Sequence, residues 1–363
     1  MFKNFFSSRK NIIFTGIFIG ISAAVLQKLG NPANMGICVA CMVRDIAGAL
    51  GLHRAEVVQY IRPEIIGFVL GALVAALIFK EFKPRAGSSP LIRFILGFLA
   101  MIGALVFLGC PWRTLLRLAG GDGNALFGLA GLIVGIWVGI FFIKSGYNLG
   151  RNQRTYTIVG WVMPVIMVGL LLLLIFRPQL PSGAVFFSTN GPGAQHAPEV
   201  IALIIALIIG FLAQRTRFCT VAAVRDVLLI KDTYLFTGVV SLLLAALVSN
   251  LILKQFHPGF QGQPIAHTNQ LWNFGGMVLA GLAFTLAGGC PGRQLFLSGE
   301  GDADAAIFVL GMVVGAGFAH NFATASSPKG PGLWGPASII AGLIICLVIG
   351  ISMSDLRQKR KET

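Results

Sequence analysis

The sequence predicts an all-α polytopic membrane protein with two inverted repeats of about five spans each and with re-entrant or broken half-helices. Hydrophobic residues make up 56% of the 363 residues, charged residues only 11%, and the mean hydropathy is +0.82. Soluble domains contain about 25% charged residues and could not bury so much apolar surface. A bilayer can accommodate it, because about 20 apolar helical residues cross its ~30 Å core.

Ten apolar segments are long enough to form these spans. They lie at residues 11–29, 61–80, 91–109, 124–144, 156–177, 197–213, 233–253, 271–289, 303–321 and 335–353. No A-x-A cleavage site follows the first segment, so we interpret it as a span rather than a signal peptide. Two further stretches, 34–50 and 217–230, are too short and too polar to cross, and we expect them to be re-entrant.

The net charge of +15 comes from short basic clusters between apolar runs, so we expect a lipid bilayer and no nucleic acid as a partner. Alternate loops carry these clusters, as the positive-inside rule requires of cytoplasmic loops. The residues are Lys3, Arg9, Lys10, Lys80, Lys83, Arg85, Arg93, Lys144, Arg151, Arg154, Arg215, Arg217, Arg225, Lys231, Arg293, Arg357, Lys359, Arg360 and Lys361. We therefore predict a multi-pass protein of the bacterial inner (cytoplasmic) membrane with both termini in the cytoplasm.

Two motifs occur twice at nearly the same separation along the chain. GICVACMVRDI at 36–46 aligns with RFCTVAAVRDV at 217–227. FLGCPWRTLLRLAGGDG at 107–123 aligns with LAGGCPGRQLFLSGEGD at 286–302. A common offset for two separate motifs indicates an internal duplication.

The duplication divides the chain into a first membrane repeat at 1–180, an external linker at 181–198 and a second membrane repeat at 199–363. The linker contains no Lys or Arg, which places it on the face opposite the basic loops. Because each repeat has five spans, an odd number, the second repeat must be inverted. Transporters with inverted repeats bind substrate near the midplane, where the repeats meet.

The Gly-Cys-Pro motifs at 109–111 and 289–291 interrupt apolar runs. Proline is tolerated at the first position of a helix, so each motif predicts a helix that breaks and restarts. The N-terminus of the new half-helix carries free N–H groups and a partial positive charge, which suit an anion. A polarisable thiol there matches soft sulfur or selenium. The same N-terminus lowers a thiol's pKa, so the residues alone leave the protonation state of these cysteines open.

Other chemically capable residues have simpler interpretations. Cys346 lies inside the last apolar run and is expected to be a packing residue. The Arg-Asp pairs at 44–45 and 225–226 are interpreted as structural ion pairs or orientation signals near the membrane edges. Arg113 and Arg293 each lie two residues after a proline of the Gly-Cys-Pro motifs. We hypothesise that they attract an anion into the vestibule of each half.

At the Gly-Cys-Pro repeats the sequence resembles the YeeE/YedE family of membrane proteins, which includes thiosulfate importers. Residues 34–67 most resemble the YedE branch, which is associated with selenium metabolism. The resemblance implies uptake of a sulfur anion along a central, cysteine-lined path without an enzymatic reaction or a cofactor. By motif, the substrate-binding residues are Cys38, Cys110 and Cys290, with Cys219 as the repeat mate of Cys38. Import of such an anion is also compatible with a soluble sulfur- or selenium-handling partner that consumes it.

The chain departs from strict repeat symmetry at Trp112, which stands where the second half has Gly292 and is expected to narrow one vestibule. Cys41 also lacks a repeat mate. Cys38 and Cys41 form a C-x-x-C pair, so the alternative function is a membrane thiol-disulfide redox protein. A metal or haem site is not expected, because the five histidines show no ligand spacing with the cysteines.

Overall fold

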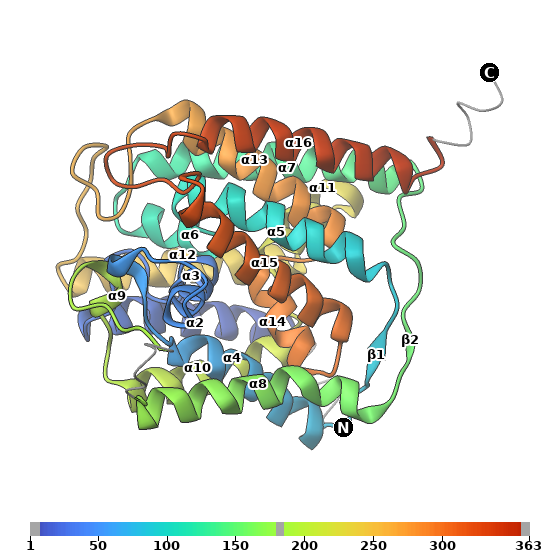
Figure 1. Ribbon diagram of the computed structural model, residues 1–363, viewed down its shortest axis with the longest axis horizontal. Coiled ribbons are helices and arrows are strands. Elements are labelled where there is room, and N and C mark those ends of the chain that lie inside the picture. The colour runs from blue at the N-terminus through green and yellow to red at the C-terminus, as the bar shows by residue number, and fades with distance from the viewer. Residues whose placement is uncertain (1–7, 179–184, 357–363) are drawn as a thin grey trace.

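The computed structural model describes residues 8–178 and 185–356 and shows an all-α bundle of long, roughly parallel and antiparallel helices (Figure 1). Within these residues ten helical segments are long and apolar enough to cross a membrane, so the chain is a multi-pass membrane protein. Some residues named above lie outside the described ranges. They are Lys3, Arg357, Lys359, Arg360, Lys361 and the linker residues 181–184.

All ten predicted spans are confirmed, and their boundaries differ from the predicted ones by no more than about three residues, the usual error of such boundaries. In the first half the long helices are α2 (Arg9–Lys28), α4 (Pro63–Ile78), α5 (Pro90–Phe107), α7 (Asn124–Lys144) and α8 (Thr157–Phe176). In the second half they are α10 (Glu199–Thr216), α12 (Tyr234–Ile252), α13 (Gln270–Ala287), α15 (Ala303–Asn321) and α16 (Gly335–Ser352).

Short elements fill the space between the long helices. They are α3 (Val39–Ala49), η1 (Glu56–Val58), α6 (Pro111–Ala119), α9 (Gly191–Ala194), α11 (Thr220–Ile230), α14 (Pro291–Gly299) and the two-stranded ribbon of β1 (Arg85–Ala86) and β2 (Gln153–Arg154). Helices α3 and α11 have 11 residues each and are about 17 Å long, roughly half the bilayer core. These lengths agree with the expectation that neither helix crosses the bilayer alone, and their re-entrant course stays a prediction.

The predicted helix breaks at both Gly-Cys-Pro motifs are present. Helix α5 ends with Leu108 in the left-handed conformation at φ 63°, and α13 ends with Gly288 at φ 88°. In each case the chain turns and α6 or α14 begins directly at the proline. Glycine adopts this conformation without steric cost, whereas Leu108 does so against its own Cβ.

The long helices pack in pairs that join the two halves of the chain. Helix α2 packs against α12, α4 against α10, α5 against α15 and α7 against α13, while α5 and α13 also contact each other. Figure 1 shows α9 and the loops near α3 at one end of the bundle, and the β1–β2 ribbon and the end of α16 at the other. We call these the α9 end and the ribbon end.

Glycine allows the paired helices to touch through their backbones. A Cβ added at Gly16 of α2 would lie 2.0 Å from the carbonyl oxygen of Gly238 in α12. One added at Gly97 of α5 would lie 2.1 Å from the carbonyl oxygen of Phe308 in α15. Small residues at such crossings are the usual way that membrane helices pack closely, since lipid provides no hydrophobic drive between them.

We expect Gly97→Ala to lower stability, because the new methyl group must push α5 and α15 apart. Overpacking of this kind costs about 1–3 kcal/mol, more than the ~1 kcal/mol that alanine gains in helix propensity. The matched control is Gly169→Ala in α8, where a Cβ meets nothing within 4 Å. Thermal unfolding in detergent should show a lower midpoint for Gly97→Ala and an unchanged or higher one for Gly169→Ala. Equal midpoints would contradict the proposed backbone contact.

Candidate functional site

Four short helices begin immediately after a cysteine. Cys38, Cys110, Cys219 and Cys290 are the N-cap residues of α3, α6, α11 and α14, and each is at most 2% exposed. Serine, threonine, aspartate or asparagine usually occupies this position. A repeated cysteine N-cap therefore brings four thiols to four partially positive helix ends.

Three of the four N-cap thiols use the same geometry, whereas Cys110 makes no side-chain cap hydrogen bond. Cys38 Sγ accepts the amide N–H of Cys41 and Cys219 Sγ accepts that of Ala222, both at 3.4 Å. Cys290 Sγ accepts the amide N–H of Arg293, also at 3.4 Å. Cys41 and Ala222 thus hold equivalent positions as backbone N–H donors, and this role does not depend on their side chains.

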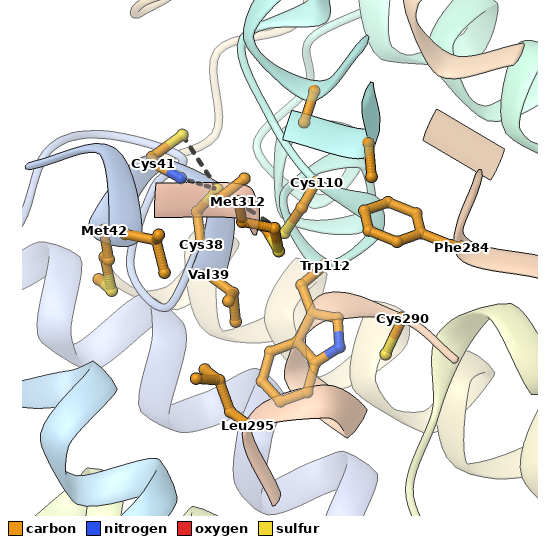
Figure 2. Packing of buried hydrophobic residues seen from close by; sticks show 14 of the residues in the cluster. Cys38, Val39, Cys41, Met42, Cys110, Trp112, Phe284, Cys290, Leu295 and Met312 are labelled. Atoms are coloured by element: carbon orange, nitrogen blue, oxygen red, sulfur yellow. Dashed lines mark hydrogen bonds between the residues drawn. The ribbon is translucent and has the colours of Figure 1, made fainter. Parts of the chain in front are cut away.

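The thiols of the first half gather in one cluster. Cys38 Sγ lies 3.7 Å from Cys110 Sγ and donates to Cys41 Sγ at 3.0 Å (Figure 2). The structure thus brings together two of the predicted site residues, which are far apart in the sequence. Cys41 also belongs to this cluster, although the sequence had assigned it only to the alternative function. Its spacing of three residues from Cys38, which brings the two side chains together at a helix start, is the sequence feature that could have placed it there.

The thiols of the second half form another cluster. The amide N–H of Cys290 donates to Cys219 Sγ at 3.3 Å. The start of α14 therefore lies directly against the start of α11, as the start of α6 lies against that of α3 in the first half. We call these two groups the upper cluster (Cys38, Cys41 and Cys110) and the lower cluster (Cys219 and Cys290).

Trp112 follows Cys110 by two residues, and its indole packs against Gly292, two residues after Cys290 (Figure 2). Its indole is fully buried and packs edge-on against Phe218 at 5.7 Å between ring centroids, with Phe68 and Phe296 at 5.9 and 6.1 Å. A Cβ at Gly292 would stand 3.0 Å from the indole, so Trp112 occupies the space that a larger residue at 292 would need. We call this group of Trp112, Phe68, Phe218 and Phe296 the aromatic barrier. That it narrows a vestibule stays a prediction.

The Trp112 indole N–H has no hydrogen-bond partner among the described residues. Buried donors are rarely left unpaired, and each exception calls for an explanation. Here the donor lies within the aromatic barrier.

Arg113 is fully buried next to the upper cluster. It donates to Cys41 Sγ at 3.4 Å and to the backbone carbonyls of Leu108 and Asn34. Within the described part of the chain no carboxylate lies within 4.0 Å of it. Its positive charge is therefore solvated by carbonyl dipoles and not neutralised.

Arg293, the repeat mate of Arg113, is paired instead. Its guanidinium lies 3.3 Å from the carboxylate of Glu300, which also binds Arg217 at 2.9 Å. The hypothesis that both arginines attract an anion therefore has different support in the two halves, because only Arg113 lacks a carboxylate partner among the described residues.

The two Arg-Asp motifs form ion pairs. Arg44 contacts Asp45 at 2.6 Å in a buried setting, and Arg225 contacts Asp226 at 2.8 Å in a partly exposed one. Asp45 also binds Arg62 at 2.7 Å. The interpretation of these motifs as ion pairs agrees with the geometry, while their effect on orientation stays a prediction.

The remaining candidates are placed as follows. Cys346 is buried in α16, and all six cysteines are free thiols. No group of three or more His, Cys, Asp or Glu side chains among residues 8–178 and 185–356 is arranged to hold a metal ion.

Comparisons with known proteins agree with the membrane fold. Residues 215–350 match the family model described as sulphur transport. The chain is 36% identical over 104 residues to the thiosulfate transporter TsuA of Spirochaeta thermophila, a match covering 27% of this chain and 29% of that protein. It is 30% identical over 93 residues to the uncharacterized protein MJ1590 of Methanocaldococcus jannaschii, covering 23% of this chain and 89% of that protein.

We expect Trp112→Ala to destabilise the protein by about 3–5 kcal/mol, because it empties the space between the clusters. Trp137→Ala is the matched control, since Trp137 is 64% exposed on the outside of α7. Thermal unfolding in detergent should show a much lower midpoint for Trp112→Ala than for Trp137→Ala. Similar midpoints would mean that Trp112 does not support the surrounding helices.

Proposed function

This chain belongs to the YeeE/YedE family of sulphur transport membrane proteins, and we propose that it imports a small selenium- or sulfur-containing anion that resembles thiosulfate. The path runs through the centre of the bundle and is lined by Cys38, Cys110, Cys219 and Cys290. The protein acts as a transporter in the bacterial inner membrane and not as an enzyme.

The pairing of cysteine-capped helix ends carries this proposal. Cys38 lies 3.7 Å from Cys110, and the Cys290 amide contacts Cys219 Sγ, so each cluster combines two helix N-termini with their two capping thiols. The N-termini favour negative charge, and the S–H groups donate hydrogen bonds to the anion. Sulfur or selenium in the substrate is a soft acceptor that suits such weak donors.

The upper and lower clusters provide successive sites. Of the two clusters, the anion binds the upper one before the lower one, at Cys38 and Cys110 beside the unpaired charge of Arg113. It then passes Trp112, whose unpartnered indole N–H offers a donor on the way. Cys290 and Cys219 receive it on the other side. In this proposal the Trp112 indole, which packs against Phe68, Phe218 and Phe296, has to move for the anion to pass.

We further propose that residues 1–180 and 199–363 are inverted repeats joined by an external linker at 181–198. The exchanged helix contacts support this: α2 packs on α12 as its repeat mate α10 packs on α4, and α5 packs on α15 as α13 packs on α7. With both termini in the cytoplasm, the α9 end is external. The upper cluster then faces the periplasm and the lower cluster faces the cytoplasm.

Import needs a source of free energy. Moving an anion inward against a negative interior costs about 2.3 kcal/mol per charge per 100 mV. Buried Arg113 lowers the cost of placing the anion in the bundle but does not drive net uptake. A co-transported cation, or rapid consumption by a soluble sulfur- or selenium-handling partner, supplies the drive.

The alternative function, a thiol-disulfide redox protein, has one observation in its favour: Cys38 Sγ and Cys41 Sγ lie only 3.0 Å apart. Both residues are 0% exposed, however, and a protein disulfide is far bulkier than a small anion, so a protein partner reaches these sulfurs less easily than the anion does. The second half also keeps its N-cap geometry with Ala222 in place of a cysteine. We therefore favour transport.

We expect Cys110→Ala and Cys290→Ala each to reduce thiosulfate or selenosulfate uptake into proteoliposomes at least about tenfold, because each removes a thiol donor from the path. Cys346→Ala is the matched control, since Cys346 is equally buried but lies in the last span. Parental uptake by the two path variants, correctly folded, would refute the cysteine-lined path.

Cys41→Ala distinguishes transport from redox chemistry. A transporter should retain most of its uptake, because Ala222 performs the same backbone role in the second half, whereas a redox protein should lose all activity. Mass spectrometry after alkylation provides the second measurement. A readily reducible disulfide between residues 38 and 41, formed during turnover, would favour the redox function.

A further inference from the structure

A cavity of about 290 Å³ opens at the α9 end of the bundle. Segments that are far apart in the sequence form it: α3, the break after α5, α9, α15 and the loops before α13 and α16. Its lining includes Arg44, Leu108, Pro192, Ile265, His320 and Ser326. We call it the Arg44 cavity.

Two polar side-chain atoms of the Arg44 cavity lack hydrogen-bond partners among the described residues. These are the hydroxyl oxygen of Ser326, a residue only 7% exposed, and Nε2 of His320. The His320 ring is held against His53, with 4.4 Å between ring centroids. Buried polar groups that the protein leaves unsatisfied are typical of a site completed by a ligand.

The charge of the wall is positive. Arg44 and Arg62 share one carboxylate, that of Asp45, at 2.6 and 2.7 Å. All three side chains are nearly or completely buried, so the group carries one net positive charge with little access to solvent. Asp45 holds Arg44 through Nε and one terminal nitrogen, Nη2, and the other terminal nitrogen, Nη1, makes no hydrogen bond with the described residues.

The Arg44 cavity leads towards the upper cluster. Leu108 lines it, and the Leu108 carbonyl accepts a hydrogen bond from Arg113. Arg113 in turn donates to Cys41 Sγ at 3.4 Å and to the carbonyl of Ile265, another lining residue. One arginine side chain therefore separates the cavity from the first thiols.

We propose that the Arg44 cavity is a separate binding site for the oxygen-bearing end of the substrate, occupied before the anion reaches the thiols. This rests on the proposed function and adds a substrate class: small tetrahedral oxyanions that carry one soft atom. Arg44, Ser326 and His320 bind the oxygens, and the soft atom points towards Arg113. Sulfate, which has oxygens alone, competes for this site but is not handed on to the thiols.

The test separates this site from the thiol path. Binding of ³⁵S-thiosulfate to the purified Cys110→Ala protein is measured by equilibrium dialysis. This method reports binding alone, so the loss of transport in this variant does not affect the measurement. In this background we expect Ser326→Ala and His320→Phe each to weaken binding about tenfold, the usual effect of losing a hydrogen bond to a charged group. The phenylalanine keeps the stacking on His53.

The control variant is Thr324→Val. Thr324 lies in the same loop, but its hydroxyl already donates to the Ala319 carbonyl, so its removal should leave binding unchanged. Sulfate is expected to displace the bound thiosulfate. Each protein is first checked for a monodisperse size-exclusion profile, and Cys290→Ala serves as a second background.

Binding of parental strength in both Ser326→Ala and His320→Phe would overturn the proposal. So would an absence of thiosulfate binding in both cysteine backgrounds while the parent protein transports. Parental transport by Cys110→Ala and Cys290→Ala would instead refute the thiol path alone, and the dialysis would still report on the Arg44 cavity.

Discussion

Every interrupted helix in a membrane must find partners for its free backbone groups within the protein, and this constraint shapes the centre of the molecule. At the start of α3, α11 and α14 a cysteine sulfur accepts an amide N–H that the preceding turn leaves free. Such breaks also have to be enclosed. The glycine-mediated contacts of the long helices contribute to the enclosure, because they bring backbones close together around the starts of the four short helices, where the capping cysteines are buried.

The spans and the helix breaks could be predicted because their causes are local. Hydropathy over about 20 residues marks a span, and the proline at 111 or 291 marks a restart whatever surrounds it. The partners of the short helices could not be predicted in the same way. The contact between Cys38 and Cys110, and that between Trp112 and Gly292, depend on how distant helices cross, and no local pattern encodes a crossing.

In the candidate site, too, the local motifs could be predicted from the sequence and the tertiary contacts could not. The repeated motifs identified the four capping cysteines, but they also assigned equal roles to Arg113 and Arg293. The structure distinguishes these arginines through Glu300, a residue with no charged counterpart near Arg113 in the described part of the chain. The Arg44 cavity was missed altogether, because its walls come from several loops and its polar atoms are recognised only by their lack of partners.

Trp112 and Gly292 occupy the same place in the repeated motif, yet in space they are neighbours that share one volume. A substitution at either position therefore affects the other. A larger residue at 292 collides with the indole, and a smaller residue at 112 leaves a cavity. The sequence history of such a pair should be one of reciprocal exchange, with bulk on one copy or on the other. Covariation between these two positions among relatives would be the record of that exchange.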